Sequence, residues 1–245
     1  MTFNNNEYRP NSFGYLPVVT KNIIIINIIA FAAKLLLQMR GISLDDYLSL
    51  HHHLAPSFKP HQFITYLFMH GSFMHILFNM FGVYIFGQVL EQVWGPKRYL
   101  IFYILTGLGA AVVQYMLLHF EITAEIARLN SYFDQDLTVA EQAQVMNYKY
   151  EFIQSLDRGA IMGASGSLFG LLGGFGMLFP NRYLYLYFFF PIKAKWLVIG
   201  YGALEIISGL RNNPGDNVAH FAHIGGLVVG VILVLAWRKN REHFY

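Results

Sequence analysis

Residues 160–179 read AIMGASGSLFGLLGGFGMLF, and residues 218–237 read VAHFAHIGGLVVGVILVLAW. Each stretch is apolar along a length that, as a helix, crosses a hydrocarbon core of about 30 Å. Each also repeats small residues four positions apart, at Gly166, Gly170 and Gly174 in the first and at Ala222, Gly226 and Gly230 in the second. Small residues at this spacing form a face along which two membrane helices approach closely. The two stretches are therefore predicted to be membrane helices that pack against each other.

The composition of the whole chain is that of a membrane protein. Of its 245 residues, 55% are hydrophobic and 13% are charged, whereas about a quarter of the residues in a typical soluble domain are charged. Apolar blocks long enough to cross a bilayer predict six helices, at residues 18–37, 73–93, 99–120, 160–179, 194–210 and 218–237. The predicted fold class is therefore all-α, a polytopic membrane protein built as a bundle of six transmembrane helices.

The positions of lysine and arginine predict the orientation of the bundle, because these residues concentrate in short cytoplasmic loops. A cytoplasmic N-terminus places on the cytoplasmic face Arg9, Lys21, Lys97, Arg98, Arg182, Lys193, Lys195, Arg238, Lys239 and Arg241. Residues 1–17 are then an N-terminal cytoplasmic tail, residues 18–238 the membrane domain, and residues 239–245 a short cytoplasmic tail. Within the domain, residues 40–72 and 121–157 form long outer loops that are predicted to contain amphipathic segments. The predicted location is a bacterial cell (inner) membrane, with both termini in the cytoplasm.

Two features of the composition exclude whole classes of function. Cysteine is absent, which excludes a thiolate nucleophile, a disulfide framework and a cysteine-ligated metal. The formal net charge is only +3, and the cations lie between apolar blocks, where they act as orientation signals rather than as a nucleic-acid footprint. The lipid bilayer is thus the predicted environment, with no nucleic-acid partner, no metal and no cofactor. The sequence makes no prediction of the oligomeric state.

Polar side chains inside the apolar helices are the candidates for function, since burying them in lipid is costly. The fourth predicted helix contains Ser165 and the sixth contains His223. The second contains His75 and Asn79, four residues apart and hence on one helical face. All three helices enter the membrane from its outer side, and at 1.5 Å per residue Ser165 and His223 each lie about 10 Å beyond the last charged residue before them. These four side chains are therefore predicted to meet at one depth.

A serine and a histidine in contact indicate hydrolytic chemistry. A serine hydroxyl is a weak nucleophile until an adjacent base accepts its proton, and histidine is the natural base near neutral pH. The oxyanion that forms on a carbonyl substrate needs preorganised donors, for which the candidates are the Ser165 N–H, His75 and Asn79. The order GASG differs from the G-x-S-x-G of α/β-hydrolases, because Ser167 stands where the second glycine would be. The residues favour a Ser165–His223 dyad in a membrane helix bundle.

Three motifs resemble those of the rhomboid family of intramembrane serine proteases. They are His75-Ile-Leu-Phe-Asn79 in the second helix, Gly163-Ala-Ser165-Gly166 in the fourth, and Ala222-His223-Ile-Gly-Gly226-Leu-Val-Val-Gly230 in the sixth. The resemblance covers about residues 63–237 and implies that Ser165 is the nucleophile and His223 the general base and acid. His75 and Asn79 would then stabilise the oxyanion, the motif glycines would serve packing, and no third acidic member is implied. The implied activity is endopeptidase cleavage in or near the transmembrane segments of membrane protein substrates.

Two further features match the family and one departs from it. His70 corresponds to a histidine that the family carries just before the second helix, and Glu91 with Gly95 resembles its ExxxG at the inner end of that helix. Many members carry a Trp-Arg pair in the loop after the first helix, where this chain has His61-Gln62. The departure concerns the anchoring of this loop and leaves the dyad intact.

Two other functions compete with proteolysis. A catalytically inactive rhomboid-like protein would bind membrane clients and direct their fate, but such relatives generally lack the serine or the histidine, and both are present here. A small-solute transporter predicts an inverted repeat or broken helices in matched halves of the sequence, and neither pattern occurs. The inactive, client-binding member of the fold is the principal alternative.

Several polar residues have a structural interpretation beside a functional one. His220 competes with His223 as the base, but His223 directly follows the first residue of the small-residue face. Residues 51–53 are all histidine and could bind a metal, although adjacent residues do not converge on one helical face, which favours a polar loop. Glu205 lies inside the fifth helix, where pairing near the outer end of the helix is favoured over a catalytic role.

Overall fold

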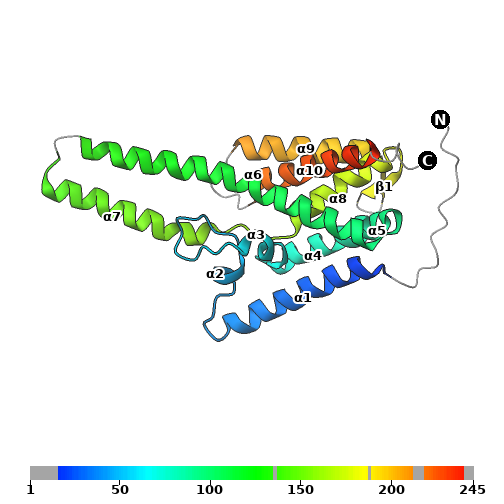
Figure 1. Ribbon diagram of the computed structural model, residues 1–245, viewed down its shortest axis with the longest axis horizontal. Helices are drawn as coiled ribbons and strands as arrows, with labels where there is room; N and C mark the ends of the chain where they lie inside the picture. The colour runs from blue at the N-terminus through cyan, green and yellow to red at the C-terminus, as the bar shows by residue number, and fades with distance from the viewer. Residues whose placement is uncertain (1–15, 135–136, 187–188, 212–217, 240–245) are drawn as a thin grey trace.

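Six helical segments make up the bundle in the computed structural model, which describes residues 16–134, 137–186, 189–211 and 218–239. The helices of the bundle (Figure 1) are α1 (Val18–Gln38), α4 (Phe73–Gly82), α5 (Gln88–Trp94), α6 (Pro96–Ser131), α8 (Ser165–Leu178), α9 (Ala194–Arg211) and α10 (His220–Lys239). A π-helical turn, η2 (Val83–Gly87), joins α4 to α5 without a break. Each of the six apolar blocks of the sequence therefore corresponds to one helical segment.

Shorter elements connect these helices. The loop after α1 holds α2 (Asp45–Leu48), α3 (Gln62–Thr65) and η1 (Tyr66–Phe68), and the loop after α6 holds η3 (Tyr132–Asp134), α7 (Val139–Ser155) and η4 (Leu156–Gly159). Ahead of α9, strands β1 (Tyr183–Leu186) and β2 (Phe190–Lys193) pair as an antiparallel hairpin. The sequence patterns do not predict this hairpin, which is a small addition to a helical fold.

The apolar helices have the dimensions of membrane spans. Among the residues that the structure describes, four segments are long and apolar enough to cross a membrane: α1, Phe73–Trp94, α6 and His220–Arg238 of α10. The apolar helix α8 has 14 residues, and α9 has 18 residues with charged side chains at Lys195, Glu205 and Arg211. Because α8 packs on α6 and α10, and α9 packs on α8 and α10, both belong to the same bundle. The chain is an integral, multi-pass membrane protein.

Glycines bring α8 and α10 into backbone contact. A Cβ atom added to Gly226 would overlap the carbonyl oxygen of Gly166, and one added to Gly230 would lie 2.7 Å from the carbonyl oxygen of Gly170. On the other side of α8, a Cβ atom at Gly170 would meet Thr106 of α6. The contact between α8 and α10 is the most extensive between any two elements. The predicted packing of these helices along their small-residue faces is confirmed.

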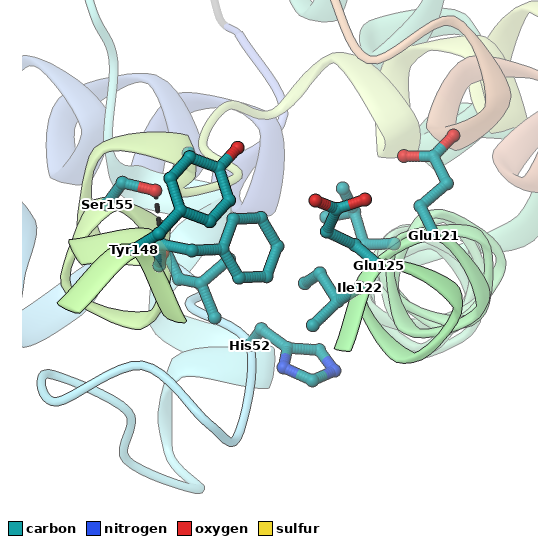
Figure 2. A pocket seen from close by; sticks show the side chains of 10 residues that line it. His52, Glu121, Ile122, Glu125, Tyr148 and Ser155 are labelled. Atoms are coloured by element: carbon teal, nitrogen blue, oxygen red, sulfur yellow. Dashed lines mark hydrogen bonds between the residues drawn. The ribbon is translucent and has the colours of Figure 1, made fainter. Parts of the chain in front are cut away.

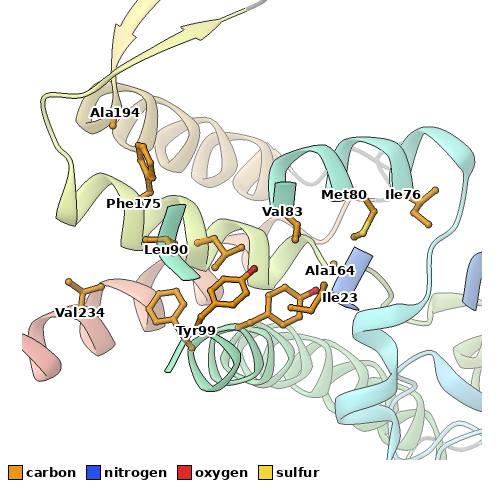
Figure 3. Packing of buried hydrophobic residues seen from close by; sticks show 13 residues of the cluster. Ile23, Ile76, Met80, Val83, Leu90, Tyr99, Ala164, Phe175, Ala194 and Val234 are labelled. Atoms are coloured by element: carbon orange, nitrogen blue, oxygen red, sulfur yellow. The ribbon is translucent and has the colours of Figure 1, made fainter. Parts of the chain in front are cut away.

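A hydrophobic core holds the helices together around α8 (Figure 3). Its large side chains include Tyr99 and Phe102 of α6 and Phe175 of α8, all of which are almost fully buried. Ala164, just before α8, and Met80 of α4 extend the core to the ends of the helices that carry the candidate site residues. The backbone around that site is therefore fixed by packing.

A buried carboxylate ties α1 to the rest of the bundle. Glu91 of α5 accepts hydrogen bonds from the backbone N–H groups of Val19 and Thr20, at 2.9 and 2.7 Å, and from the Thr20 hydroxyl at 2.8 Å. These N–H groups lie in the first turn of α1, where a negative charge is stabilising. Gly95, at φ +77°, then turns the chain into α6. The Glu91–Gly95 motif therefore has a structural role at this end of the bundle.

Two helix bounds differ from the prediction by more than three residues. α8 begins at Ser165 and not at residue 160, because Ile161 forms an antiparallel bridge with Leu50 and Gly163 adopts φ +121°, a conformation that favours glycine. α6 continues to Ser131 instead of ending at residue 120, since α7 folds back beside its extension to form a hairpin beyond the bundle (Figure 1). Hydropathy marks the apolar part of a helix, and tertiary contacts decide where the helix ends.

Candidate functional site

Ser165 and His223 lie in contact where α8 and α10 begin. Ser165 is the first residue of α8, and its Oγ atom lies 2.8 Å from His223 Nε2, at hydrogen-bond distance. The buried His223 ring stacks on Phe169, one turn further along α8, with 4.3 Å between the ring centroids and 7° between the planes. Phe169 thereby holds the imidazole beside the hydroxyl. The contact between Gly166 and Gly226 brings the two helices close enough for this pairing.

The start of α8 presents backbone donors beside the serine hydroxyl. Ser165 occupies the first turn of the helix, where N–H groups lack partners within the helix and the helix dipole is positive. Gly163, at φ +121°, directs the chain into this turn. An anion that forms next to Ser165 Oγ would therefore meet a favourable electrostatic environment.

His75 and Asn79 of α4 line the backbone just ahead of Ser165. A Cβ atom added to Gly163 would lie 2.7 Å from His75 Nε2 and 3.7 Å from Asn79 Nδ2. Asn79 Nδ2 is buried and has no hydrogen-bond partner among the described residues. The Gly71 N–H donates to His75 Nδ1 at 3.4 Å, so the neutral ring carries its proton on Nε2. Both side chains thus present an N–H donor on the Gly163 side of the site.

A carboxylate for which the sequence favoured a structural role also reaches the site. Glu205 Oε2, on α9, lies 2.6 Å from His220 Nδ1 and 3.0 Å from His223 Nδ1. The side chains of Glu205, His220 and His223 are 13%, 14% and 10% exposed. In the sequence, Glu205 stands out only as a carboxylate inside an apolar span. Nothing in the linear pattern shows that the face of α9 that carries Glu205 is turned toward α10.

The other serine and histidine that the sequence offers have different partners. Ser167 Oγ is fully buried and donates a hydrogen bond to the Tyr103 carbonyl oxygen at 2.7 Å, a structural role that suits a serine in a membrane helix. His220 contacts Glu205. His223 is the histidine that lies at hydrogen-bond distance from Ser165.

A lysine of α1 fixes the segment that precedes α4. Lys34 Nζ forms an ion pair with Asp45 Oδ2 at 2.8 Å and donates to the His70 carbonyl oxygen at 2.9 Å. The His70 ring lies edge-on to His75, with 5.0 Å between the centroids. Burial lowers the pKa of His70 to about 3, and His75 and Lys34 act in the same direction, so the His70 ring is neutral at physiological pH. His70 therefore supports His75 by packing.

Gln62 anchors the long loop after α1. Its fully buried side chain donates from Nε2 to the Ser57 carbonyl oxygen at 2.8 Å. Its Oε1 atom accepts from the N–H groups of His51 and Lys59, at 3.2 and 3.1 Å. One side chain thus satisfies several backbone groups that would otherwise be buried without partners. The sequence departs from the Trp-Arg pair at this point, and the glutamine supplies the anchoring.

Of the three histidines at residues 51–53, His52 and His53 approach His119 of α6, whereas the His51 ring contacts the Ser49 carbonyl oxygen. The Leu54 N–H donates to His52 Nδ1 at 3.3 Å, which leaves the His52 proton on Nε2, 3.2 Å from His119 Nδ1. Burial, followed by the neighbouring His53 and His119, lowers the pKa of His52 to about 4. Ligand atoms of the three rings lie within 4.8 Å of one another, a spacing that could hold a metal ion. His52 and His119 are already joined by a hydrogen bond, which gives part of this cluster a structural role.

A pocket of about 440 Å³ lies next to this histidine cluster, between α6 and α7 (Figure 2). Its lining includes His52, Glu121, Ile122, Glu125, Tyr148 and Ser155. Ser165 and His223 do not line it, because it lies at the hairpin and not at the junction of α8 and α10. The pocket is therefore separate from the Ser165–His223 site.

The fold and the site define a multi-pass membrane protein in which a serine and a histidine meet where two closely packed helices begin. Residues 57–240 match the rhomboid domain family. The chain belongs to the rhomboid family and has its six-transmembrane fold.

The sequence identity to individual relatives is low. The chain is similar to RHOMBOID-like protein 12, mitochondrial, of Arabidopsis thaliana, with 30% identity over 206 residues that cover 83% of this chain and 52% of the relative. It is similar to Rhomboid-like protein 11, chloroplastic, of the same plant, with 26% identity over 86% of this chain and 62% of the relative. Similarity to Rhomboid protease AarA of Providencia stuartii is 27% over 70% of this chain and 53% of the relative. The chain therefore spans between 52% and 62% of the length of these relatives.

Proposed function

We propose that this protein is an intramembrane serine endopeptidase that hydrolyses peptide bonds in or near the transmembrane segments of other membrane proteins. The observation that carries the proposal is the 2.8 Å approach of Ser165 Oγ to His223 Nε2 inside a membrane helix bundle. Membership of the rhomboid family supports it, as does similarity to a protein named a rhomboid protease. The substrates are transmembrane proteins, and the reaction needs no cofactor.

The reaction follows from the chemistry of the two side chains. Ser165 Oγ attacks the carbonyl carbon of the scissile peptide while His223 Nε2 accepts the hydroxyl proton. The imidazolium then donates that proton to the departing amine, which leaves an ester between Ser165 and the acyl part of the substrate. Water attacks this ester with His223 again as the base, and the proton returns to Ser165 Oγ as the carboxylic acid departs. Both side chains end in their starting protonation states.

Three N–H groups are proposed to stabilise the oxyanion of each tetrahedral intermediate: the Ser165 backbone N–H, His75 Nε2 and Asn79 Nδ2. The placement of His75 and Asn79 against Gly163 supports this role. A buried donor without a partner is unfavourable in the resting protein, and a negatively charged oxygen would satisfy it. Each such donor lowers the barrier by about 3 to 4 kcal/mol in a soluble serine protease.

Covalent labelling tests the proposed function against the principal alternative, an inactive rhomboid-like protein that binds clients. A serine-reactive phosphonate with a fluorophore is expected to label the native protein, and mass spectrometry of the modified peptide should locate the label at Ser165. Ser165→Ala protein should remain unlabelled, because the nucleophile is gone. A native protein that captures transmembrane peptides but takes up no label would favour the client-binding alternative.

Asn79→Ala is expected to slow acylation of Ser165 about a hundredfold or more, because the loss of one oxyanion donor has an effect of this size. The rate of phosphonate labelling in detergent measures it. Asn27→Ala is the matched control, since Asn27 is a buried asparagine of α1 whose Nδ2 donates to the Ile23 carbonyl oxygen at 2.8 Å. Labelling of Asn79→Ala at the native rate would move Asn79 from the catalytic residues to the structural ones.

We infer that both termini are cytoplasmic in a bacterial inner membrane and that the site opens on the opposite side. The distribution of lysine and arginine supports this orientation, and the start of α1 and the end of α10 lie at the same end of the bundle, away from α7 (Figure 1). Because the chain lacks cysteine, single introduced cysteines can report on exposure to each side.

Val139→Cys, at a position 84% exposed at the start of α7, is expected to react with a membrane-impermeant maleimide in intact spheroplasts. Tyr183→Cys, at a position 55% exposed in β1, is expected to react only after the spheroplasts are lysed. The start of α7 and strand β1, which carry these positions, lie at opposite ends of the molecule (Figure 1). The reverse labelling pattern would show that the termini are outside.

A further inference from the structure

Glu205 lies between two histidines at the beginning of α10. Its Oε2 atom lies 2.6 Å from His220 Nδ1 and 3.0 Å from His223 Nδ1, and none of the three side chains is more than 14% exposed. A carboxylate inside a membrane helix is unfavourable unless it is paired. Here one of its partners is the imidazole that contacts Ser165. The carboxylate of α9 is thus linked through one ring to the candidate nucleophile.

The contact with Ser165 determines which ring nitrogen of His223 carries the proton in the neutral imidazole. For Nε2 to accept the proton of Ser165 Oγ, at 2.8 Å, the neutral ring must carry its own proton on Nδ1. Nδ1 is also the ring atom next to Glu205 Oε2. The two contacts are therefore compatible with a single tautomer of His223, which is the tautomer that a base for Ser165 requires.

The carboxylate also acts on the charged form of the His223 ring. When His223 accepts a proton it becomes an imidazolium in a largely buried site, where an uncompensated charge is unfavourable. A carboxylate at 3.0 Å from Nδ1 offsets this charge. In the resting protein, His223 Nδ1 and Glu205 Oε2 are close enough for an ion pair, but the two groups are not aligned for a hydrogen bond. Catalytic contacts of this kind tighten when substrate binds and charge develops.

From these contacts we propose that Glu205 is a positioning residue for His223, so that the site is a Ser165–His223–Glu205 triad and not a dyad. This inference rests on the proposed function and differs from the expectation of the sequence motifs, which imply no acidic member. Glu205 touches no reacting atom. It acts through the tautomer, the orientation and the charge of His223, as the buried aspartate does in soluble serine proteases.

A substitution at His220 distinguishes this positioning role of Glu205 from simple ion pairing inside the membrane. It shares Glu205 Oε2 with His223, so it is the other residue that would keep the carboxylate satisfied. If Glu205 only stabilised the junction of α9 and α10, removal of His220 would do as much damage as removal of the carboxylate. If Glu205 positions His223, the protein should tolerate a change at His220.

The test compares native protein with Glu205→Gln, Glu205→Asp, His220→Gln and Ser165→Ala in detergent. Cleavage of a reporter transmembrane substrate gives kcat and KM separately, and thermal unfolding gives the stability of each variant. Glu205→Gln keeps the size of the side chain and removes its charge, so kcat is expected to fall about tenfold or more while KM stays within about twofold. Glu205→Asp keeps the charge on a shorter side chain and should have an intermediate kcat. His220→Gln should retain kcat within about threefold of native.

Three outcomes would overturn the inference: a native kcat in Glu205→Gln, an equal loss of kcat in Glu205→Gln and His220→Gln, or a loss in Glu205→Gln that only parallels a lower unfolding temperature and does not recover in Glu205→Asp. A native protein that behaves like Ser165→Ala in both cleavage and labelling would overturn the proposed function, and this inference with it. An active native protein with an unaffected Glu205→Gln variant would overturn the inference alone.

Discussion

Ser165→Ala and His223→Ala are each expected to abolish cleavage of a transmembrane reporter while folding and membrane insertion stay intact. Each change removes one half of a pair whose reacting atoms lie 2.8 Å apart. In a soluble serine protease, loss of either partner lowers kcat by about a millionfold, and the two losses are not additive. Both single variants should therefore fall to background, and the double variant should fall no further. Cleavage is measured with protein reconstituted in liposomes, and folding by circular dichroism.

Ser167→Ala is the matched control, because Ser167 lies two residues further along the same helix. Its hydroxyl donates to the Tyr103 carbonyl oxygen at 2.7 Å, so its loss should lower stability by about 1 kcal/mol and leave cleavage near the native rate. Native cleavage by Ser165→Ala would contradict the assignment of the nucleophile. Native cleavage by His223→Ala would contradict the assignment of the base.

Gly226→Ala is expected to destabilise the bundle and to reduce cleavage strongly. The added methyl group would overlap the carbonyl oxygen of Gly166, a backbone atom that cannot move aside as a flexible side chain would. Overpacking of this kind costs about 1 to 3 kcal/mol. The helices must separate to relieve it, which lengthens the contact between Ser165 and His223. A lower unfolding temperature in detergent and a lower kcat in the cleavage assay would both report this separation.

Gly200→Ala is the matched control for this change. Gly200 lies on α9, and a Cβ atom added there meets no atom of the described residues within 4 Å. The same substitution in open space should leave stability unchanged or slightly higher, because alanine has the better helix propensity. If Gly226→Ala were as stable and as active as Gly200→Ala, the backbone contact between α8 and α10 would not determine the geometry of the site.

Apolar length and small-residue spacing predict the number of helices and the pairing of α8 with α10, because both depend on local pattern. The ends of the helices depend on contacts that the pattern does not contain. Residues 160–164 are as apolar as the helix that follows, yet they are not helical, since Ile161 bridges to Leu50 and Gly163 turns the chain. The predicted depth of Ser165 counted 1.5 Å per residue through these positions, and this count is wrong because α8 begins only at Ser165. Ser165 and His223 nevertheless lie in contact.

The candidate site could be predicted only in part, because some of its residues lie in recognisable local patterns and others depend on tertiary contacts. Ser165, His223, His75 and Asn79 stand out because they are polar residues in apolar helices, and short motifs surround them. Their catalytic roles are proposals that the experiments above test. Glu205 has no motif around it, and its contact with α10 depends on how α9 is rotated and placed, which a sequence of moderate hydropathy does not specify. Gln62 was likewise beyond prediction, because its partners are backbone atoms of a loop that has no regular pattern.

We expect the contact between Gly166 and Gly226 to act as a pivot for α8 and α10, because the two backbones touch there. Where two backbones touch, no rotamer is available to absorb a change in distance. Membrane helices adjust their tilt when the thickness of the bilayer changes, and a tilt moves the ends of two crossed helices more than their crossing point. Ser165 and His223 lie within one turn of this point. We therefore expect the distance between hydroxyl and imidazole to change little with bilayer thickness. In the proposed endopeptidase, a thinner or thicker membrane should then alter the approach of a substrate more than the chemical step.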